Sequence, residues 1–91
     1  MPEPNRPKIL IVDDKPENLV VLRGVLEAVD AEVIEARDGN SALVATLDND
    51  FAVALLDVQM PGMSGYELAE LLRGDPKTRN IQLLYLTAFD A

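Results

Sequence analysis

The chain contains no cysteine and no histidine. Without cysteine it forms neither a disulfide framework nor a thiolate metal site, and this absence is typical of proteins in a reducing compartment. Without histidine it has no imidazole for zinc binding, for acid–base catalysis or for a Ser-His-Asp triad. The chemistry left for a functional site is therefore that of carboxylates and hydroxyls.

Basic residues are also few, with 8 lysines and arginines against 16 acids and a net charge of -8. Because the bases are spread along the chain, the protein repels nucleic-acid phosphates and anionic membrane surfaces. No apolar stretch approaches the length of a membrane span, and the proline-rich start has no signal-peptide core. We expect a cytoplasmic protein that binds neither nucleic acid nor membranes directly.

The length of the chain allows one folded domain. Its 91 residues are 48% hydrophobic, which is enough for a single core but leaves no room for a second folded unit. We expect residues 1–7 to form a flexible N-terminal segment and residues 8–91 to form the domain.

Short apolar runs alternate with segments of helical periodicity. The apolar runs predict strands at residues 9–12, 31–36, 51–56 and 81–86. The third run is apolar throughout, which predicts a central position in the sheet. Strands that alternate with helices indicate a parallel sheet with right-handed crossovers, the doubly wound α/β class.

The segments between the strands carry signals for helix starts. Asp14 can act as or near the N-cap of the first helix, and Asp38 is the expected cap of the second. Ser64 and Glu67 match a capping box at the start of the third. Gly24, inside the first helix, weakens it and predicts close packing against a neighbour.

Acidic residues follow two of the predicted strands. Asp13 and Asp14 come directly after the first, and Asp57 follows the third. If these strands are neighbours, the three carboxylates share the crevice at the carboxyl ends of the strands, where doubly wound sheets bind ligands. Crowded carboxylates need protons or a cation. Each acid also has a purely structural interpretation, as a helix cap or a solvated turn residue, but that does not explain why acids gather at both strand ends.

The turn after the first strand argues against nucleotide binding. Rossmann and P-loop folds both need a glycine-rich turn there, and this chain has Asp13, Asp14, Lys15 and Pro16 instead. Acids at that turn repel phosphate unless a cation is bound first.

Four short motifs resemble the receiver domains of two-component response regulators. They are ILIVDD at residues 9–14, LLD at 55–57, MPG at 60–62 and LTA at 86–88, in the order of the family and across nearly the whole chain. The resemblance implies a flavodoxin-like fold in which the strands follow the order 2-1-3-4-5.

The resemblance also implies a phosphoacceptor. Asp57 would accept a phosphoryl group from a histidine kinase or phosphotransfer protein, as an acyl phosphate, and signal to an output domain or partner. Mg²⁺ would be bound by Asp13, Asp14 and Asp57, with the main-chain carbonyl of Gln59 as a further ligand. Thr87 would contact a phosphoryl oxygen and act as a switch, although backbone could equally satisfy its hydroxyl. Activity would be limited to self-phosphorylation and dephosphorylation on Asp57, with no turnover of an external substrate.

The sequence departs from the family at its end. Receivers continue with a helix, a fifth strand that carries a lysine, and a final helix, whereas this sequence stops at Ala91. We expect a receiver whose last helix-strand-helix portion is missing, with switching impaired more than phosphoryl uptake. The fourth strand would then be a bare edge, through which we expect a dimer or a domain swap.

Two other functions stay open. One is a docking module with a receiver fold that works without phosphorylation, which the absence of the lysine favours and the three acids disfavour. The other is a phosphohydrolase with an aspartate nucleophile, but such enzymes usually place a second acid two residues after the first, where this chain has Gln59.

Overall fold

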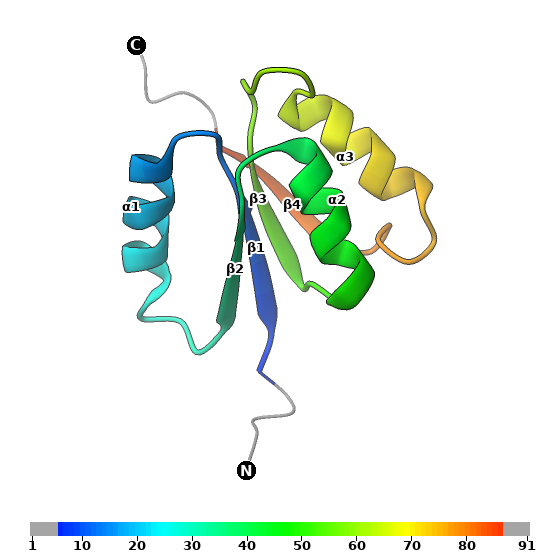
Figure 1. Cartoon of the computed structure of the whole chain (residues 1–91). Helices are drawn as coiled ribbons and strands as arrows, with labels where there is room; N and C mark the ends of the chain where they lie inside the picture. The colour runs from blue at the N-terminus through cyan, green and yellow to red at the C-terminus, as the bar shows by residue number, and fades with distance from the viewer. Residues whose placement is uncertain (1–5, 87–91) are drawn as a thin grey trace.

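The computed structural model describes residues 6–86, in which strands and helices alternate strictly (Figure 1). The elements are β1 (Lys8–Val12), α1 (Pro16–Leu26), β2 (Glu32–Ala36), α2 (Gly39–Asp48), β3 (Val53–Asp57), α3 (Gly65–Gly74) and β4 (Gln82–Leu86). The predicted order of elements is confirmed. The third strand begins two residues later than the apolar run suggested, at Val53.

All strand pairs are parallel, in the order β2-β1-β3-β4, which confirms the doubly wound class. The apolar strands β1 and β3 lie in the middle of the sheet, as predicted. Val12 lies opposite Leu56 in the β1–β3 pair. The residues that follow each of these, Asp13 and Asp57, therefore emerge side by side at the same edge of the sheet.

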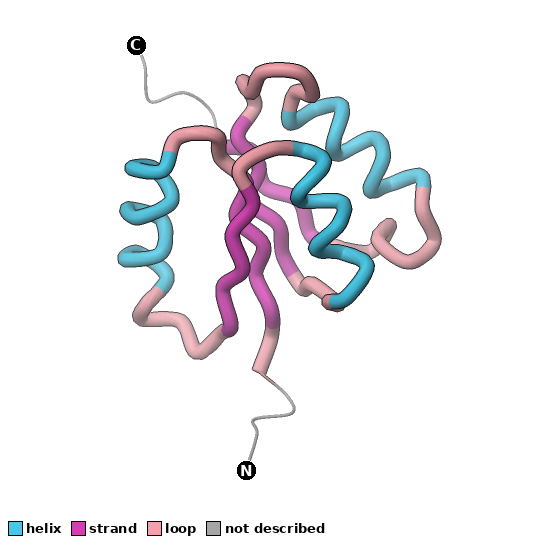
Figure 2. Tube along the Cα trace, viewed as in Figure 1, coloured by secondary structure: helices cyan, strands magenta, loops and turns pink. Residues whose placement is uncertain are grey.

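The helices cover both faces of the sheet, with α1 on one face and α2 and α3 on the other (Figure 2). Successive side chains of β1 point to opposite faces, so one strand feeds two cores. Ile9 and Ile11 pack with Leu19 of α1. Leu10 and Val12 belong to the larger core under α2 and α3.

Two of the predicted helix starts are confirmed by hydrogen bonds. The Asp38 carboxylate accepts the N–H of Ser41 at 2.7 Å, and this bond lowers the pKa of Asp38. Ser64 and Glu67 form the predicted capping box, in which each side chain accepts the other's backbone N–H, at 3.1 and 2.9 Å. These caps fix where α2 and α3 begin, close to the carboxyl ends of the strands.

Asp14 lies one residue before the N-cap of α1, so it is near the cap, as predicted, but is not the cap itself. The N-cap is Lys15, without a side-chain cap, and Pro16 follows at the first helical position. The backbone N–H of Lys15 is bound instead by the carboxylate of Asp13, at 3.0 Å. The acid that precedes Asp14 therefore binds the backbone where α1 begins, and Asp14 makes no capping contact.

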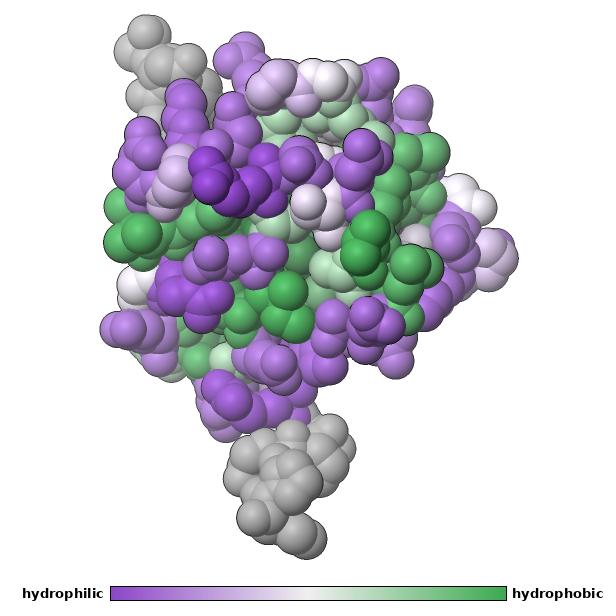
Figure 3. All heavy atoms as spheres, in the orientation of Figure 1, coloured by the Kyte–Doolittle hydropathy of each residue, from purple (hydrophilic) through white to green (hydrophobic). Residues whose placement is uncertain are grey.

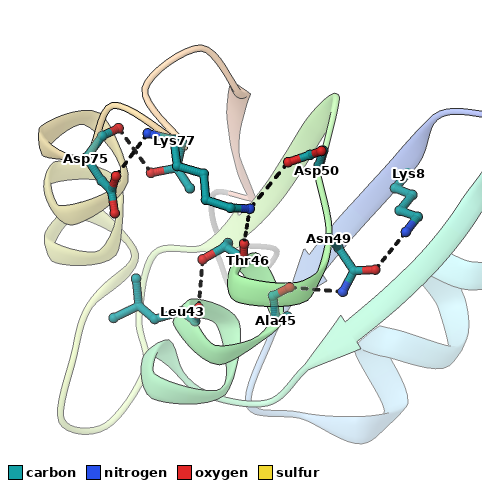
Figure 4. Close-up of polar contacts among 9 residues, drawn as sticks. Lys8, Leu43, Ala45, Thr46, Asn49, Asp50, Asp75 and Lys77 are labelled. Atoms are coloured by element: carbon teal, nitrogen blue, oxygen red, sulfur yellow. Dashed lines mark hydrogen bonds and ion pairs between the residues drawn. The ribbon is translucent and has the colours of Figure 1, made fainter.

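Polar contacts link neighbouring elements at the amino ends of the strands, opposite the acidic residues (Figure 4). Lys77 donates to the carbonyl of Thr46 at 2.7 Å and pairs with Asp50 at 3.3 Å. Lys8, at the start of β1, donates to the Asn49 side chain at 2.8 Å. These bonds hold the end of α2 against the segment before β4 and against β1, away from the acidic edge.

Hydrophobic side chains also reach the surface over α1 and over α2 and α3 (Figure 3). Val25 of α1 is 68% exposed, Leu47 of α2 is 70% exposed, and Leu84 of β4 is 55% exposed. Single apolar side chains are common on protein surfaces, and these three come from different elements. Within residues 6–86, no helix is both long and apolar enough to cross a membrane.

Two glycines differ in what surrounds them. A Cβ on Gly65, the first residue of α3, would lie 2.9 Å from the carbonyl carbon of Asp57, and the Gly65 N–H donates to the Val58 carbonyl at 3.0 Å. Gly24 has nothing within 4 Å of its Cβ position, so the predicted close packing is wrong. Only Gly65 is required by the approach of two backbone segments.

These surroundings predict opposite effects for two alanine substitutions. Gly65→Ala should lower the free energy of unfolding by about 1–3 kcal/mol, because backbone must move to admit the methyl group. Gly24→Ala should raise it by up to about 1 kcal/mol through helix propensity alone. Urea unfolding followed by circular dichroism measures both, and equal effects would contradict the close approach at Gly65.

Candidate functional site

The three acids predicted to share a crevice do so. Asp13, Asp14 and Asp57 can each place one carboxylate oxygen within 4.8 Å of the others. The parallel pairing of β1 and β3 produces this cluster, because both strands end at the same edge of the sheet. We refer to these residues as the acidic cluster.

Asp13 is the most enclosed member, with 3% of its surface exposed. Its backbone N–H continues the ladder to β2 by donating to the Ala36 carbonyl at 3.1 Å. One carboxylate oxygen accepts the N–H of Lys15 at 3.0 Å, and the other accepts the side-chain amide of Asn18 at 3.1 Å. Both oxygens are therefore held by neutral donors.

Asp14 has a buried oxygen without a partner. Its Oδ1 atom makes no hydrogen bond within the described part of the chain, although the residue is only half-buried. A buried carboxylate oxygen without a donor is costly, since it loses water and gains nothing in return. The atom points to a ligand that supplies positive charge.

Asp57 is the half-buried last residue of β3. One of its oxygens accepts a long hydrogen bond of 3.3 Å from the N–H of Gln59. Burial, followed by repulsion from the charge of Asp13, raises the pKa of Asp57 from 3.8 to about 6. The physical origin is plain, because a carboxylate partly removed from water beside other carboxylates holds its proton more strongly.

The acidic cluster fits a hard divalent cation. Its donors are all carboxylate oxygens, the ligand type that Mg²⁺ prefers, and Oδ1 of Asp14 has no hydrogen-bond partner within residues 6–86. The raised pKa of Asp57, caused first by burial and then by the charge of Asp13, is consistent with a site that lacks positive charge.

The other two residues predicted for the site are Gln59 and Thr87. Gln59 lies in the loop after β3 and contacts Asp57 through its N–H, while its side chain is exposed. Thr87 lies outside the described residues.

Two residues at the site were missed by sequence reasoning. Asn18 contacts Asp13 from the first turn of α1, and Gly65 allows α3 to start against the backbone of Asp57. The spacing of five residues between Asp13 and Asn18 across a helix start is the signal that could have found the first. A glycine at a capped helix start is the signal for the second.

An apolar hollow of about 180 Å³ adjoins the cluster. Its lining combines Asp13 and Asn18 with Val21, Leu22 and Leu86. A larger hollow of about 600 Å³ lies between the start of α2 and α3, and none of the three acids lines it. Within residues 6–86, the acidic cluster thus lies at the carboxyl ends of the strands, with Asp13 in the wall of the smaller hollow.

Comparison with known proteins agrees with this geometry. A family model described as the response regulator receiver domain matches residues 9–91. The response regulator PleD of Caulobacter vibrioides is 41% identical over 83 residues, which cover 91% of this chain and 18% of PleD. This chain thus spans less than a fifth of that curated relative.

Solved structures share the fold. The N-terminal domain of a response regulator receiver protein from Methanoculleus marisnigri has a TM-score of 0.85 and 38% identity, covering 89% of this chain and 66% of that one. The receiver domain of the sensor histidine kinase PA1611 from Pseudomonas aeruginosa has a TM-score of 0.84 and 26% identity, covering 92% and 69%. That structure holds a magnesium ion coordinated in its active-site cleft.

The raised pKa of Asp57 predicts how stability depends on pH in metal-free buffer. A carboxyl whose pKa rises on folding stabilises the fold while it is protonated, and that contribution is lost as the pH rises through about 6. Asparagine at this position cannot ionise and so avoids the destabilisation. At pH 7.5 we therefore expect the free energy of unfolding of Asp57→Asn to exceed that of wild type by about 1 kcal/mol, after allowance for solvent screening.

Urea unfolding with a chelator at pH 7.5 and pH 4.5 measures this effect. The advantage of Asp57→Asn should shrink at the lower pH, where wild-type Asp57 is protonated in the folded state. Glu70→Gln, which removes an exposed carboxylate from α3, is the matched control and should show no such change. An Asp57→Asn variant less stable than wild type at pH 7.5 would contradict the crowding of charge.

Proposed function

The chain belongs to the response regulator receiver family, and from that premise we propose that it is a phosphoacceptor. Asp57 takes a phosphoryl group from a histidine kinase or a phosphotransfer protein, and the modified domain signals to an output domain or partner protein. The observation that carries this proposal is the meeting of three carboxylates at the ends of β1 and β3.

Among the three acids, the environment favours Asp57 as the phosphoryl acceptor. Asp13 is enclosed and both of its oxygens already accept hydrogen bonds. One oxygen of Asp14 is buried. Asp57 is half-buried and accepts one long bond from Gln59, so it can present an oxygen to a phosphorus atom that arrives from solvent.

The transfer itself requires an ionised Asp57. Its pKa of about 6 leaves the carboxylate largely ionised at neutral pH, so an oxygen lone pair can attack phosphorus. A new oxygen–phosphorus bond forms, the bond from phosphorus to the donor atom breaks, and the donor keeps that electron pair. The product is an acyl phosphate on Asp57.

The other residues of the site would bind a cation. Asp13 and Asp14 would hold Mg²⁺ together with Asp57, and the carbonyl of Gln59 is the fourth proposed protein ligand. When bound, the ion would offset the negative charge of the carboxylates and of the incoming phosphoryl group. The Gln59 N–H keeps the Asp57 carboxylate oriented at the strand end.

Intact mass after incubation with acetyl phosphate tests the phosphoacceptor proposal. With Mg²⁺ present, wild type should gain the mass of one phosphoryl group, and Asp57→Asn should gain none. Glu70→Gln serves as the control that loses a distant carboxylate and keeps the adduct. A chelator should abolish the gain.

Two results would contradict the proposal. An adduct of equal yield on Asp57→Asn would place the chemistry elsewhere. No adduct on folded wild type that binds Mg²⁺ would favour a docking module that works without phosphorylation.

We also propose that β4 mediates self-association. Within residues 6–86, β4 pairs with β3 alone, and its Leu84 and Tyr85 are 55% and 43% exposed. A strand edge with apolar side chains is suited to pairing with a second chain.

Light scattering across a concentration series tests the association. We expect a dimer of wild type at high concentration, and loss of the dimer in Leu84→Lys, because a charged residue on the strand disfavours the contact. Val20→Lys, at an exposed position on α1, is the matched control and should still dimerise. A wild type that stays monomeric throughout would rule this mode out.

A further inference from the structure

Asn18 lies beside the acidic cluster without being an acid. Its side-chain amide donates to Oδ2 of Asp13 at 3.1 Å, across the start of α1. The residue is half-buried and lines the hollow next to Asp13. Leu19, the next residue, is 3% exposed in the core beneath α1, so the helix holds Asn18 at a fixed height over the strand end.

The contact is more than a helix cap. Asn18 is the third residue of α1, where a side chain commonly reaches back to the backbone N–H of the N-cap residue. Here that N–H, from Lys15, is taken by Oδ1 of Asp13, and Asn18 binds the other oxygen of the same carboxylate. The two donors therefore fix the plane of the Asp13 carboxylate from both sides.

The type of donor matters as much as its position. A carboxylate has about four lone-pair sites, so two hydrogen bonds still leave room for a cation on each oxygen. An amide donates without carrying charge, and the negative charge of Asp13 remains available. A lysine or arginine at the same place would form an ion pair and compete with a bound cation.

We propose that Asn18 is a positioning residue for the metal site, acting through Asp13. It orients the Asp13 carboxylate toward the position that a divalent cation would occupy, and this role rests on the proposed function of the acidic cluster. Removing a residue that hydrogen-bonds to a metal ligand typically lowers the metal affinity about 10–100-fold.

Isothermal titration of the metal-free protein with Mg²⁺ tests the role without any phosphorylation. Asn18→Ala should raise the Kd for Mg²⁺ by about 10-fold or more. Asn18→Gln, which keeps an amide donor on a longer side chain, should recover part of the affinity. Asn40→Ala is the matched control, since Asn40 is an exposed asparagine in the first turn of α2, and it should bind Mg²⁺ as wild type does.

Unfolding in the metal-free state separates positioning from a purely structural role. If Asn18 only tethers α1, Asn18→Ala lowers the free energy of unfolding while the Kd for Mg²⁺ stays at the wild-type value, and the inference is overturned. If wild type itself does not bind Mg²⁺, the metal site fails together with the inference. Should Asn18→Ala not fold, Asn18→Leu, which keeps the size of the side chain and removes the donor, takes its place, and a wild-type Kd for Mg²⁺ in that variant would overturn the inference.

Discussion

The parallel pairing of β1 with β3 is the constraint on which the rest of the structure depends. Because Val12 and Leu56 are partners in that register, the two strands end together and deliver Asp13, Asp14 and Asp57 to one place. A shift of one residue would turn the buried side chains of β1 toward the wrong face and separate the acids. The same register thus builds both hydrophobic cores and the acidic cluster.

The acidic cluster destabilises the fold that brings its three carboxylates together. Burial and neighbouring charge raise the pKa of Asp57, which means that its ionised form is disfavoured in the folded state. The surrounding contacts offset this cost with neutral donors. Asp13 accepts from the backbone N–H of Lys15 and the side-chain amide of Asn18, and Asp57 accepts from the backbone N–H of Gln59. None of these donors cancels the negative charge, so the demand for a cation persists.

Sequence reasoning predicted what depends on local pattern. Alternating apolar runs gave the sheet class and the central position of β3, and the caps at Asp38 and Ser64 need only residues within one turn. The errors came from contacts across elements. Whether Asp14 is the cap or only precedes it depends on where β1 ends and α1 begins, and nothing in the sequence shows that Gly24 faces open space.

The positions of the acids after the predicted strands identified them and the family resemblance implied their roles, but what distinguishes one acid from another is its three-dimensional surroundings. Three chemically similar side chains differ in enclosure. Asp13 has both oxygens bonded, Asp14 has one buried oxygen without a partner among residues 6–86, and Asp57 is half-buried with a raised pKa. From these environments we propose that Asp13 is an oriented ligand, Asp14 a ligand in need of a cation and Asp57 an accessible nucleophile. On the same grounds, contacts with neutral residues such as Asn18 belong to the proposed site.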